Sequence, residues 1–363
     1  IEMKAAVFHG PNQPLTIEQV DVDDPQDHEV LMRTAATGVC HSDLHFVEGL
    51  YPHPAPAILG HEAAGVVEKV GKSVTYLKPG DHVISCPSVF CGYCEECMSG
   101  HPNRCNNRQA TQRPKDGKPR LSQNGAPVRQ FSDLSTYAEK MLVHENALCK
   151  ITNEMPLDRA ALIGCGVTTG VGAALNTAKI EPGSTVAVFG CGGVGISVIQ
   201  GAKIGGARRI IAVDQFENKL AMAKRFGATD TIDASHTDAL KEIRTMTGGG
   251  VDYAFEAVGV KKLAEQCFDA TKVGGTAVII GMIPVGQKVE IDGPRLLTER
   301  TLKGSMMGSN RFRIDMPRYI DYYMQGRLNL DDMVSKRAKL ENINDAFGAM
   351  KRGEVARTVI MFD

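Results

Sequence analysis

Cysteine is the residue type whose spacing in this sequence points most directly to chemistry. Four cysteines, Cys91, Cys94, Cys97 and Cys105, fall within fifteen positions. Thiolates are natural zinc ligands, and four of them close a tetrahedral shell with no open position, so this spacing predicts a structural zinc site. The alternatives are four free thiols and a nucleic-acid zinc ribbon. The flanking Glu95-Glu96 provides no basic cluster, which disfavours the ribbon.

A second group of possible zinc ligands is dispersed along the chain, in Cys40, His61 and Cys165. Each residue taken singly is weak evidence, because a lone cysteine is usually a small packed hydrophobe. His61-Glu62 is not an HExxH motif, since Gly65 occupies the fifth position. A set of two cysteines and one histidine would leave a fourth position open, as catalytic zinc requires. Spacing does not pair these three residues.

A glycine loop indicates dinucleotide binding. The apolar run 186–189 leads into Gly190-x-Gly192-x-x-Gly195 and then into an apolar helical pattern, and Asp214 ends the next strand candidate. In such a unit the helix N-terminus binds a pyrophosphate, and the acidic residue accepts hydrogen bonds from the adenosine ribose and repels a 2′-phosphate. The pattern therefore favours NAD over NADP. The alternative is a structural turn followed by an incidental aspartate.

These residues require two kinds of supporting element. The first 85 or so residues contain short β-branched runs separated by turn signals, which predicts a mostly antiparallel β domain. Residues 101–135 lack a sustained period and predict a long excursion. From about Ser184 strands and helices alternate, which indicates a parallel sheet covered on both faces. The predicted strands of this sheet are 185–189, 209–213, 229–232, 252–255, 276–280 and 301–303, with helices over 219–226 and 262–271. Further helices over 315–326 and 342–352 and a strand over 358–362 follow.

Composition narrows the classes of protein. The chain has 363 residues, a formal net charge of −1, 43% apolar and 23% charged residues. This excludes disordered and collagenous chains, disfavours a nucleic-acid or membrane partner, and suggests two or three domains. The N-terminal residues lack the apolar core of a secretory signal, so we expect a cytoplasmic protein. The ten cysteines are then expected to be ligands or packed thiols rather than disulfides.

Taken together, and in this order, the motifs resemble those of the zinc-dependent medium-chain alcohol dehydrogenases, in particular the class I and III branch. They are Cys40-x-Ser42-Asp43, Gly60-His61-Glu62-x-x-Gly65, the cysteine loop, Gly164-Cys165-Gly166, and the Gly190 loop with Asp214. The resemblance implies an α/β protein with a GroES-like, mostly antiparallel catalytic domain (1–166 and 307–363) and a Rossmann domain (167–306). It also implies NAD, two zinc ions per chain, and reversible oxidation of a primary or secondary alcohol to an aldehyde or ketone.

The resemblance assigns roles to individual residues. Cys40, His61 and Cys165 match the catalytic zinc ligands, and Asp43 matches the carboxylate that orients His61. Ser42 and His45 match a proton relay, and Glu62 matches an acid behind the metal. The residues that match cofactor contacts are Gly190, Gly192, Gly193, Val194, Gly195, Asp214, Lys219, Val258, Ile280, Met282, His41 and Arg357, the last two at the pyrophosphate. His41 stands where many relatives carry an arginine.

Departures from the family pattern concern the substrate. Class III enzymes, which oxidise the glutathione adduct of formaldehyde, usually carry an arginine where this chain has Gln109, although Arg108 is adjacent. An apolar stretch, Tyr51-Pro52-His53-Pro54, replaces acidic residues expected at the pocket rim. We therefore expect an apolar pocket with walls from Tyr51, Pro87, Phe131, Met282 and Met307. Met282 and Met307 could equally be ordinary core residues.

Two other functions remain open at the sequence level. One is a glutathione-dependent formaldehyde dehydrogenase. The other is a zinc-stabilised NAD-binding sensor, which would need the cysteine loop and the glycine loop but not Ser42, Cys40 or Cys165. The expected partners are a small-molecule substrate and a second copy of the chain, with a homotetramer as the alternative to a homodimer.

Overall fold

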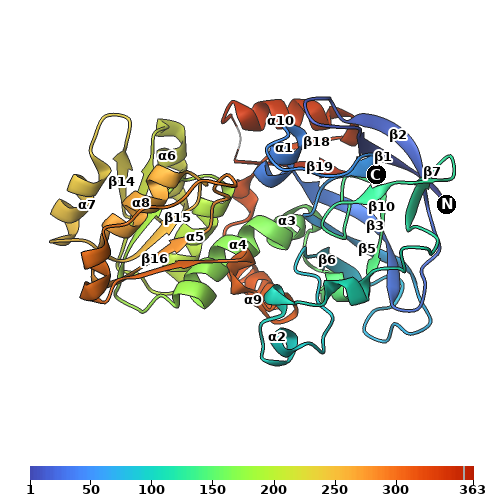
Figure 1. Ribbon diagram of the computed structural model, residues 1–363, viewed down its shortest axis with the longest axis horizontal. Coiled ribbons are helices and arrows are strands. Elements are labelled where there is room, and N and C mark those ends of the chain that lie inside the picture. The colour runs from blue at the N-terminus through green and yellow to red at the C-terminus, as the bar shows by residue number, and fades with distance from the viewer. Residues whose placement is uncertain (355) are drawn as a thin grey trace. The chain divides into compact units, whose positions relative to one another are not determined.

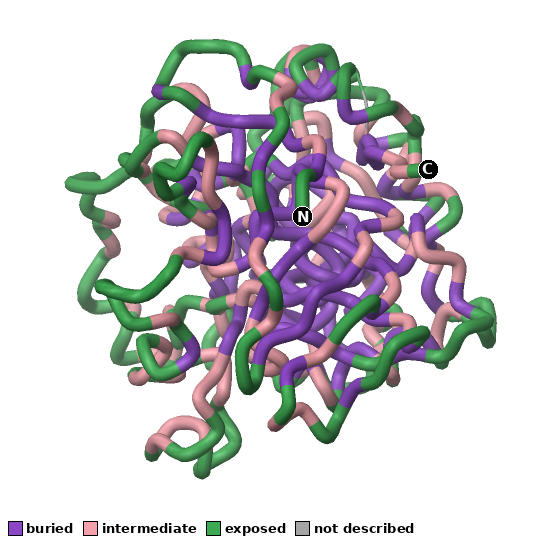
Figure 2. The backbone as a smooth tube through the Cα atoms, turned by 90° about the vertical axis from the view of Figure 1, so that its right-hand side faces the viewer, coloured by how far each residue is buried: buried purple, intermediate pink, exposed green. Residues whose placement is uncertain are grey.

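The computed structural model describes residues 1–354 and 356–363, and the chain folds as two compact units. Unit 1 comprises residues 1–165, 311–325 and 330–363, and unit 2 comprises residues 166–310 and 326–329. Chain segments from both termini thus build unit 1 (Figure 1). In Figure 2 the buried stretches of backbone lie toward the interior and the exposed stretches toward the outside.

Unit 1 contains two mostly antiparallel sheets, in agreement with the predicted β domain. The first has the order β8-β7-β2-β1-β4-β9, and the second the order β11-β6-β5-β3-β19-β18, with β10 also paired to β3. Two pairs, β4 with β9 and β18 with β19, are parallel. The strands of the first sheet are β1 (Glu2–Phe8), β2 (Thr16–Val22), β4 (Ala57–Ile58), β7 (Leu121–Gln123), β8 (Ala126–Pro127) and β9 (Arg129–Gln130). Those of the second are β3 (Glu29–Gly38), β5 (Ala63–Val70), β6 (His82–Ser85), β10 (Lys140–His144), β11 (Leu148–Ile151), β18 (Val334–Ala338) and β19 (Arg357–Met361).

The helices of unit 1 connect or cover these strands. They are α1 (His41–Val47), α2 (Glu95–Met98), α3 (Leu157–Leu162), α9 (Phe312–Met324) and α10 (Ile343–Lys351). The predicted C-terminal helices and last strand are present with shifted ends.

Unit 2 is a parallel sheet with the order β14-β13-β12-β15-β16-β17. Its strands are β12 (Thr185–Phe189), β13 (Arg209–Asp214), β14 (Asp230–Asp233), β15 (Val251–Glu256), β16 (Thr271–Ile279) and β17 (Thr301–Gly304). Its helices are α4 (Thr168–Gly172), α5 (Gly193–Ile204), α6 (Glu217–Phe226), α7 (Ala239–Thr247) and α8 (Lys261–Asp269).

Helices cover both faces of this parallel sheet. Val186 and Val188 of β12 pack in one apolar cluster with α5 and α6, whereas Ala187 and Phe189 pack in another with α7 and α8. Successive strand residues point to opposite faces, so a strand buried on both faces reads as a continuous apolar run. The predicted doubly covered parallel sheet is confirmed.

The excursion over residues 101–135 is more structured than the sequence suggests. It contains two 3₁₀ turns, Pro102–Arg104 and Arg108–Thr111, and the short strands β7 to β9. Strands of two or three residues carry no readable alternation, which explains why the pattern did not predict them.

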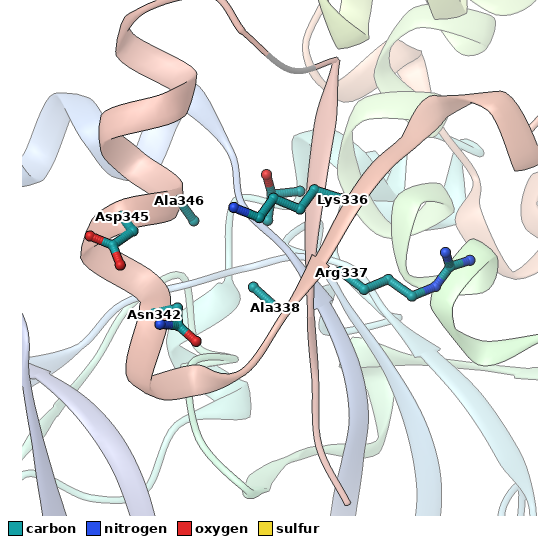
Figure 3. A pocket seen from close by; sticks show the side chains of 7 residues that line it. Lys336, Arg337, Ala338, Asn342, Asp345 and Ala346 are labelled. Carbon is teal, nitrogen blue, oxygen red and sulfur yellow. The ribbon is translucent and has the colours of Figure 1, made fainter.

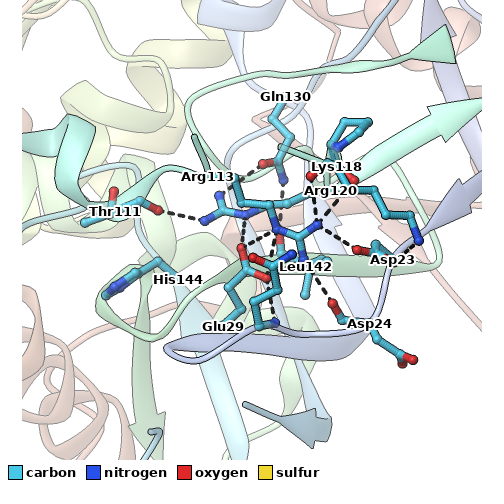
Figure 4. A network of polar contacts seen from close by, with 12 residues as sticks. Asp23, Asp24, Glu29, Thr111, Arg113, Lys118, Arg120, Gln130, Leu142 and His144 are labelled. Carbon is cyan, nitrogen blue, oxygen red and sulfur yellow. Dashed lines mark hydrogen bonds and ion pairs between the residues drawn. The ribbon is translucent and has the colours of Figure 1, made fainter. Parts of the chain in front are cut away.

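Buried ion pairs hold this excursion against the first strands of unit 1. Arg113 donates to Glu29 Oε2 at 2.6 Å and to Asp23 Oδ2 at 2.7 Å, and Arg120 Nε donates to Glu29 Oε1 at 2.7 Å (Figure 4). Arg120 also donates to the backbone oxygen of Thr111 at 2.7 Å. Because Glu29 is only 4% exposed, its two arginine partners provide the charge compensation that a buried carboxylate needs.

One helical run, Leu157–Ala178, has the length and apolarity of a membrane span, but 89% of its most apolar window is buried inside the protein. Burial against protein accounts for this apolarity, because a helix that is hydrophobic all round is typical of a large core.

Candidate functional site: a three-ligand metal centre in unit 1

Cys40, His61 and Cys165 converge in unit 1. Their ligand atoms all lie within 4.8 Å of one another, and His61 Nε2 is 3.2 Å from Cys165 Sγ. Cys40 follows β3 and precedes α1, His61 precedes β5, and Cys165 lies in a π-helical turn, Ile163–Val167. Zinc–ligand bonds of about 2.0–2.3 Å place tetrahedral ligands about 3.3–3.8 Å apart. The three side chains therefore fit a zinc ion with one open coordination position.

Asp43 fixes which nitrogen of His61 faces the cysteines. Its Oδ1 lies 3.0 Å from His61 Nδ1 and accepts a hydrogen bond from the Gly60 backbone N–H at 3.2 Å. Asp43 is fully buried. A carboxylate on the far nitrogen is the usual companion of a metal-binding histidine, because it sets the tautomer and the ring orientation.

The two thiols of the centre have different acidities. A hydrogen bond from the Cys165 thiol holds the pKa of Cys40 well below its usual value, against the opposing effect of burial. The same hydrogen bond, together with burial, raises the pKa of Cys165. A buried thiolate next to an imidazole is a donor set suited to zinc.

Glu62 and Arg357 form a buried ion pair beside the centre. Arg357 Nη2 donates to Glu62 Oε1, and both side chains are at most 6% exposed. Burial raises the pKa of Glu62 to about 7, although the charge of Arg357 opposes this. Glu62 Oε2 has no hydrogen-bond partner within the described parts of the chain. The structure thus places Arg357 on Glu62, and its contact with a pyrophosphate stays a prediction.

Helix α1 carries three of the predicted site residues, His41, Ser42 and His45. Ser42 and His45 are three positions apart and so lie on the same side of the helix. His45 Nδ1 is buried without a hydrogen-bond partner in residues 1–354 and 356–363, and its ring stacks on Tyr51 with centroids 6.0 Å apart.

An aromatic cluster lies beside the metal ligands. Phe131 meets the His61 ring edge-on at 5.8 Å, Phe46 at 4.8 Å and His53 at 5.4 Å. Tyr51 packs against Phe46 at 5.7 Å. The structure therefore brings two of the predicted pocket residues, Tyr51 and Phe131, into one aromatic cluster that reaches His61.

Arg108 does not provide a free cation near this cluster. Its guanidinium donates to Asp133 Oδ2 at 2.7 Å. The remaining predicted pocket residues are Pro87, which is partly exposed in unit 1, and Met282 and Met307, which belong to unit 2. Met282 is 38% exposed, and Met307 Sδ accepts a hydrogen bond from Thr169 Oγ1 at 3.4 Å.

The four clustered cysteines also come together. Sγ–Sγ distances are 3.4 Å for Cys94–Cys97, 3.9 Å for Cys94–Cys105 and 4.0 Å for Cys91–Cys97. A tetrahedron with Zn–S bonds of about 2.3 Å has edges of about 3.8 Å, whereas a disulfide would need about 2.05 Å. A backbone hydrogen bond from Cys97 lowers the pKa of Cys94 to about 6. The geometry fits a closed zinc shell.

The glycine loop of unit 2 has the geometry that a pyrophosphate site requires. Gly190 has φ of +95°, and a Cβ on Gly195 would lie 1.8 Å from the Gly190 carbonyl oxygen. Helix α5 begins at Gly193 with no side-chain cap, so its first N–H groups remain available to an anion.

Asp214 lies where strand β13 ends and supports this loop. Its Oδ2 accepts a hydrogen bond from the Cys191 N–H at 2.8 Å, and its Oδ1 accepts from Gln215 at 2.8 Å. Lys219 lies over the ring of Phe216 at 5.1 Å. The ribose contacts of Asp214 and Lys219 stay predictions.

Val258, Ile280 and Met282 follow the carboxyl ends of β15 and β16, where ligands bind in open parallel sheets. Val258 is 47% exposed, and so is available to a ligand at that edge.

A cavity of about 220 Å³ lies elsewhere in unit 1 and does not include any predicted site residue (Figure 3). It lies between α10 and strands β18 and β19, and Lys336 and Asp345 are among its lining residues. Residues beside the metal centre that the sequence analysis missed are Tyr137, whose hydroxyl reaches Asp43, and Thr136, which bonds Thr37. No local pattern marks either residue, since their partners lie 94 and 99 positions away.

Comparison with known proteins places these features in a family context. Residues 26–153 match the family model for the alcohol dehydrogenase GroES-like domain, and residues 193–322 match that for zinc-binding dehydrogenases. The chain is 41% identical to the alcohol dehydrogenase class-3 of Myxine glutinosa over 367 residues, covering 99% of this chain and 98% of the relative.

Two solved structures are similar over the whole chain. One is an alcohol dehydrogenase zinc-binding domain protein from Burkholderia ambifaria, with a TM-score of 0.96, 37% identity, and coverage of 100% of this chain and 99% of that one. The other is the benzyl alcohol dehydrogenase of Acinetobacter calcoaceticus, with a TM-score of 0.95, 32% identity and full coverage of both chains.

Proposed function

Because the chain belongs to the zinc-binding alcohol dehydrogenase family, we propose that it catalyses the reversible, NAD-dependent oxidation of a primary or secondary alcohol to an aldehyde or ketone. The observation that carries this proposal is the buried set Cys40, His61 and Cys165, which leaves one zinc position open to substrate. A purely structural protein or a sensor would not need this second, open site.

When bound, zinc supplies a Lewis acid for the substrate oxygen, and NAD⁺ supplies the acceptor for the hydride. Cys40, His61 and Cys165 would hold the catalytic zinc, and Cys91, Cys94, Cys97 and Cys105 would hold the structural one. The glycine loop and Asp214 bind NAD. Asp43 orients His61 through Nδ1 so that Nε2 faces the metal position.

The hydroxyl proton of the substrate requires a path to solvent. In the proposed path Ser42 Oγ takes the substrate proton while it gives its own proton toward His45, and the two side chains lie on one side of α1. His45 Nδ1 is buried and has no hydrogen-bond partner in the described chain, which leaves one ring nitrogen for such a relay. Glu62 and Arg357 provide a charge pair behind the ligands.

For the substrate, we propose medium-sized alcohols with an apolar or aromatic group. The rings of Tyr51, Phe46 and Phe131 beside His61 support this assignment, as does the similarity to a benzyl alcohol dehydrogenase. Pro87 provides no ring on its side of the pocket, which leaves room for a larger group.

Oxidation of the glutathione adduct of formaldehyde is the second candidate, and the similarity to a class-3 enzyme favours it. Gln109 and the pairing of Arg108 with Asp133 argue against it, because neither leaves a free cation for the carboxylates of glutathione.

An NAD-linked alcohol panel, run with and without glutathione plus formaldehyde, tests both candidates. We expect oxidation of benzyl and medium-chain alcohols without glutathione. Strong dependence on glutathione would reverse this ranking. Metal analysis should give two zinc ions per chain, whereas one zinc would favour the sensor.

We also propose a cytoplasmic homodimer with domains 1–166 plus 307–363 and 167–306. Zinc sites that need reduced thiols suit a reducing compartment. Strand β17 is the last strand of its sheet, and nearby Leu297 is 88% exposed, which supports pairing of two sheets at this edge.

A further inference from the structure

A third buried residue continues the chain of hydrogen bonds that starts at His61. Tyr137 Oη donates to Asp43 Oδ2 at 2.7 Å, while Asp43 Oδ1 lies 3.0 Å from His61 Nδ1. Tyr137 and Asp43 are fully buried and His61 is 4% exposed. We propose that Tyr137 is a positioning residue for the catalytic metal: its hydroxyl fixes the Asp43 carboxylate, and through it the ring of His61. This inference rests on the proposed zinc function.

The hydrogen bond has a defined direction. Burial and the neighbouring Asp43 carboxylate raise the pKa of Tyr137 well above its usual value, so the phenol keeps its proton and donates it. Each Asp43 oxygen then has its own donor, Tyr137 on Oδ2 and the Gly60 N–H on Oδ1. With both oxygens bonded, the carboxylate cannot rotate away from His61 Nδ1.

The backbone and ring of Tyr137 are themselves fixed. Its N–H donates to the Leu59 oxygen at 3.1 Å, its carbonyl accepts from the Ala6 N–H at 2.9 Å, and its ring meets Phe347 edge-on at 6.0 Å. The hydroxyl therefore approaches Asp43 from a rigid frame rather than from a mobile side chain.

The preceding residue supports the same centre from another side. Thr136 Oγ1 bonds Thr37 Oγ1 at 2.7 Å, and Thr37 Oγ1 donates to the Glu62 carbonyl at 2.8 Å. Gly60, with φ of +88°, has no room for a Cβ, which would lie 2.3 Å from Thr136 Oγ1. The 136–137 dipeptide thus holds the His61 side chain and the Glu62 backbone together.

Two effects of the Tyr137 hydroxyl act in opposite directions. By withdrawing charge from Asp43 it weakens the Asp43–His61 hydrogen bond, because both donors draw on the charge of one carboxylate. By donating to Oδ2, the hydroxyl keeps this buried anionic oxygen from turning toward another donor. Without the hydroxyl, Asp43 would lose a whole hydrogen bond. Orientation therefore dominates, and removing the hydroxyl should weaken zinc binding.

The test is Tyr137→Phe, which removes only the hydroxyl, with zinc affinity measured by chelator competition on the full-length protein. Loss of outer-shell support costs roughly 10–100-fold in metal affinity, and we expect about 10-fold here because Tyr137 acts through Asp43. The four-cysteine site on the same chain is the internal control and should keep its affinity. In the cobalt-substituted protein, the absorption of the three-ligand site should shift while that of the four-cysteine site stays constant.

Two further variants separate positioning from a general structural role. Tyr323→Phe removes a solvent-exposed phenol-to-carboxylate hydrogen bond, from Tyr323 Oη to Asp331 Oδ1 at 2.9 Å. Neither residue is a metal ligand, so this variant should leave both zinc sites unchanged. The double variant Asp43→Asn/Tyr137→Phe should bind zinc no more weakly than Asp43→Asn.

The inference is overturned by unchanged affinity at the three-ligand site, by equal loss at both sites, or by additive losses in the double variant. A wild-type chain with one zinc would instead contradict the proposed function itself, and this inference with it.

Discussion

At the residue scale, the arrangement of Ser42 and His45 on α1 predicts a separable effect on proton transfer. Ser42→Ala removes the hydroxyl that passes the substrate proton to His45, and general acid–base groups contribute about 10²–10⁴-fold to rate. We expect kcat to fall by about 100-fold, with zinc content and NADH affinity unchanged. Steady-state kinetics, metal analysis and NADH fluorescence measure the three quantities. Ser42→Thr, which keeps a hydroxyl, should retain most activity; equal loss in both variants would contradict the relay.

His41 leads to a second prediction at this scale. It begins α1 and is exposed, and the family resemblance leads us to expect an arginine at this position. An arginine keeps its charge at all working pH values and binds phosphate through two hydrogen bonds, which an imidazole does not. His41→Arg should therefore slow NADH dissociation, as measured by stopped-flow fluorescence. Unchanged or faster release would show that His41 does not contact the pyrophosphate.

Individual residues also show what the sequence could reveal. The four-cysteine zinc site could be identified from the sequence because all four ligands lie in one local segment, between Cys91 and Cys105. Cys40, His61 and Cys165 could not be paired from spacing, since His61 and Cys165 are 104 positions apart and only the fold brings them together. The family resemblance provided that pairing. The contact of Arg357 with Glu62 could not be read from spacing either, since the two residues are 295 positions apart, and the pyrophosphate contact of Arg357 stays a prediction.

At the element scale, the ion pairs of Glu29 with Arg113 and Arg120 predict how the stability of the 101–135 excursion depends on pH. Burial would raise the pKa of Glu29, but the hydrogen bond from Arg113 and the charge of Arg120 hold it below its usual value. A lowered carboxyl pKa contributes stability above its unfolded-state value of about 4.3, and this stability is lost as pH falls through the folded-state value.

Glu29→Gln should therefore destabilise unit 1 most at neutral pH, by about 3–5 kcal/mol, because it leaves two buried arginines without their carboxylate. The difference in the free energy of unfolding between this variant and the wild type should narrow as the pH falls below about 4. Urea midpoints across pH 3–7 measure this. Glu68→Gln, which breaks an exposed pair with Lys140, is the matched control and should cost under about 1 kcal/mol. If Glu29→Gln destabilised the protein equally at every pH, the charge of Glu29 would not be the source of this stability.

The element scale also shows where periodicity predicts well. The alternate packing of β12 residues into two apolar clusters follows directly from its continuous apolar sequence, Val186-Ala187-Val188-Phe189. Strands β8 and β9 have two residues each and are defined by their partners rather than by their own pattern.

At the scale of the whole molecule, the exposed edge at β17 predicts the state of association. Leu297 and Val285 are 88% and 87% exposed, and large apolar side chains left in water favour association. We expect a dimer in analytical ultracentrifugation, and Leu297→Lys should weaken it. Lys288→Ala, which changes a nearby polar residue, is the control. A wild-type monomer at micromolar concentration would contradict the predicted interface.

The segment of residues 91–105 around α2, here called the cysteine lobe, offers a way to judge how much zinc a preparation contains. Helix α2 buries none of its residues, and Met98 and Tyr93 are 75% and 64% exposed, so the lobe has little apolar packing of its own. Its shape must come from the metal, as in small zinc domains that unfold without it. Trypsin digestion can therefore serve as a quality measure for a preparation: zinc-depleted molecules should be cut first at Arg104, while fully loaded molecules should resist cleavage there.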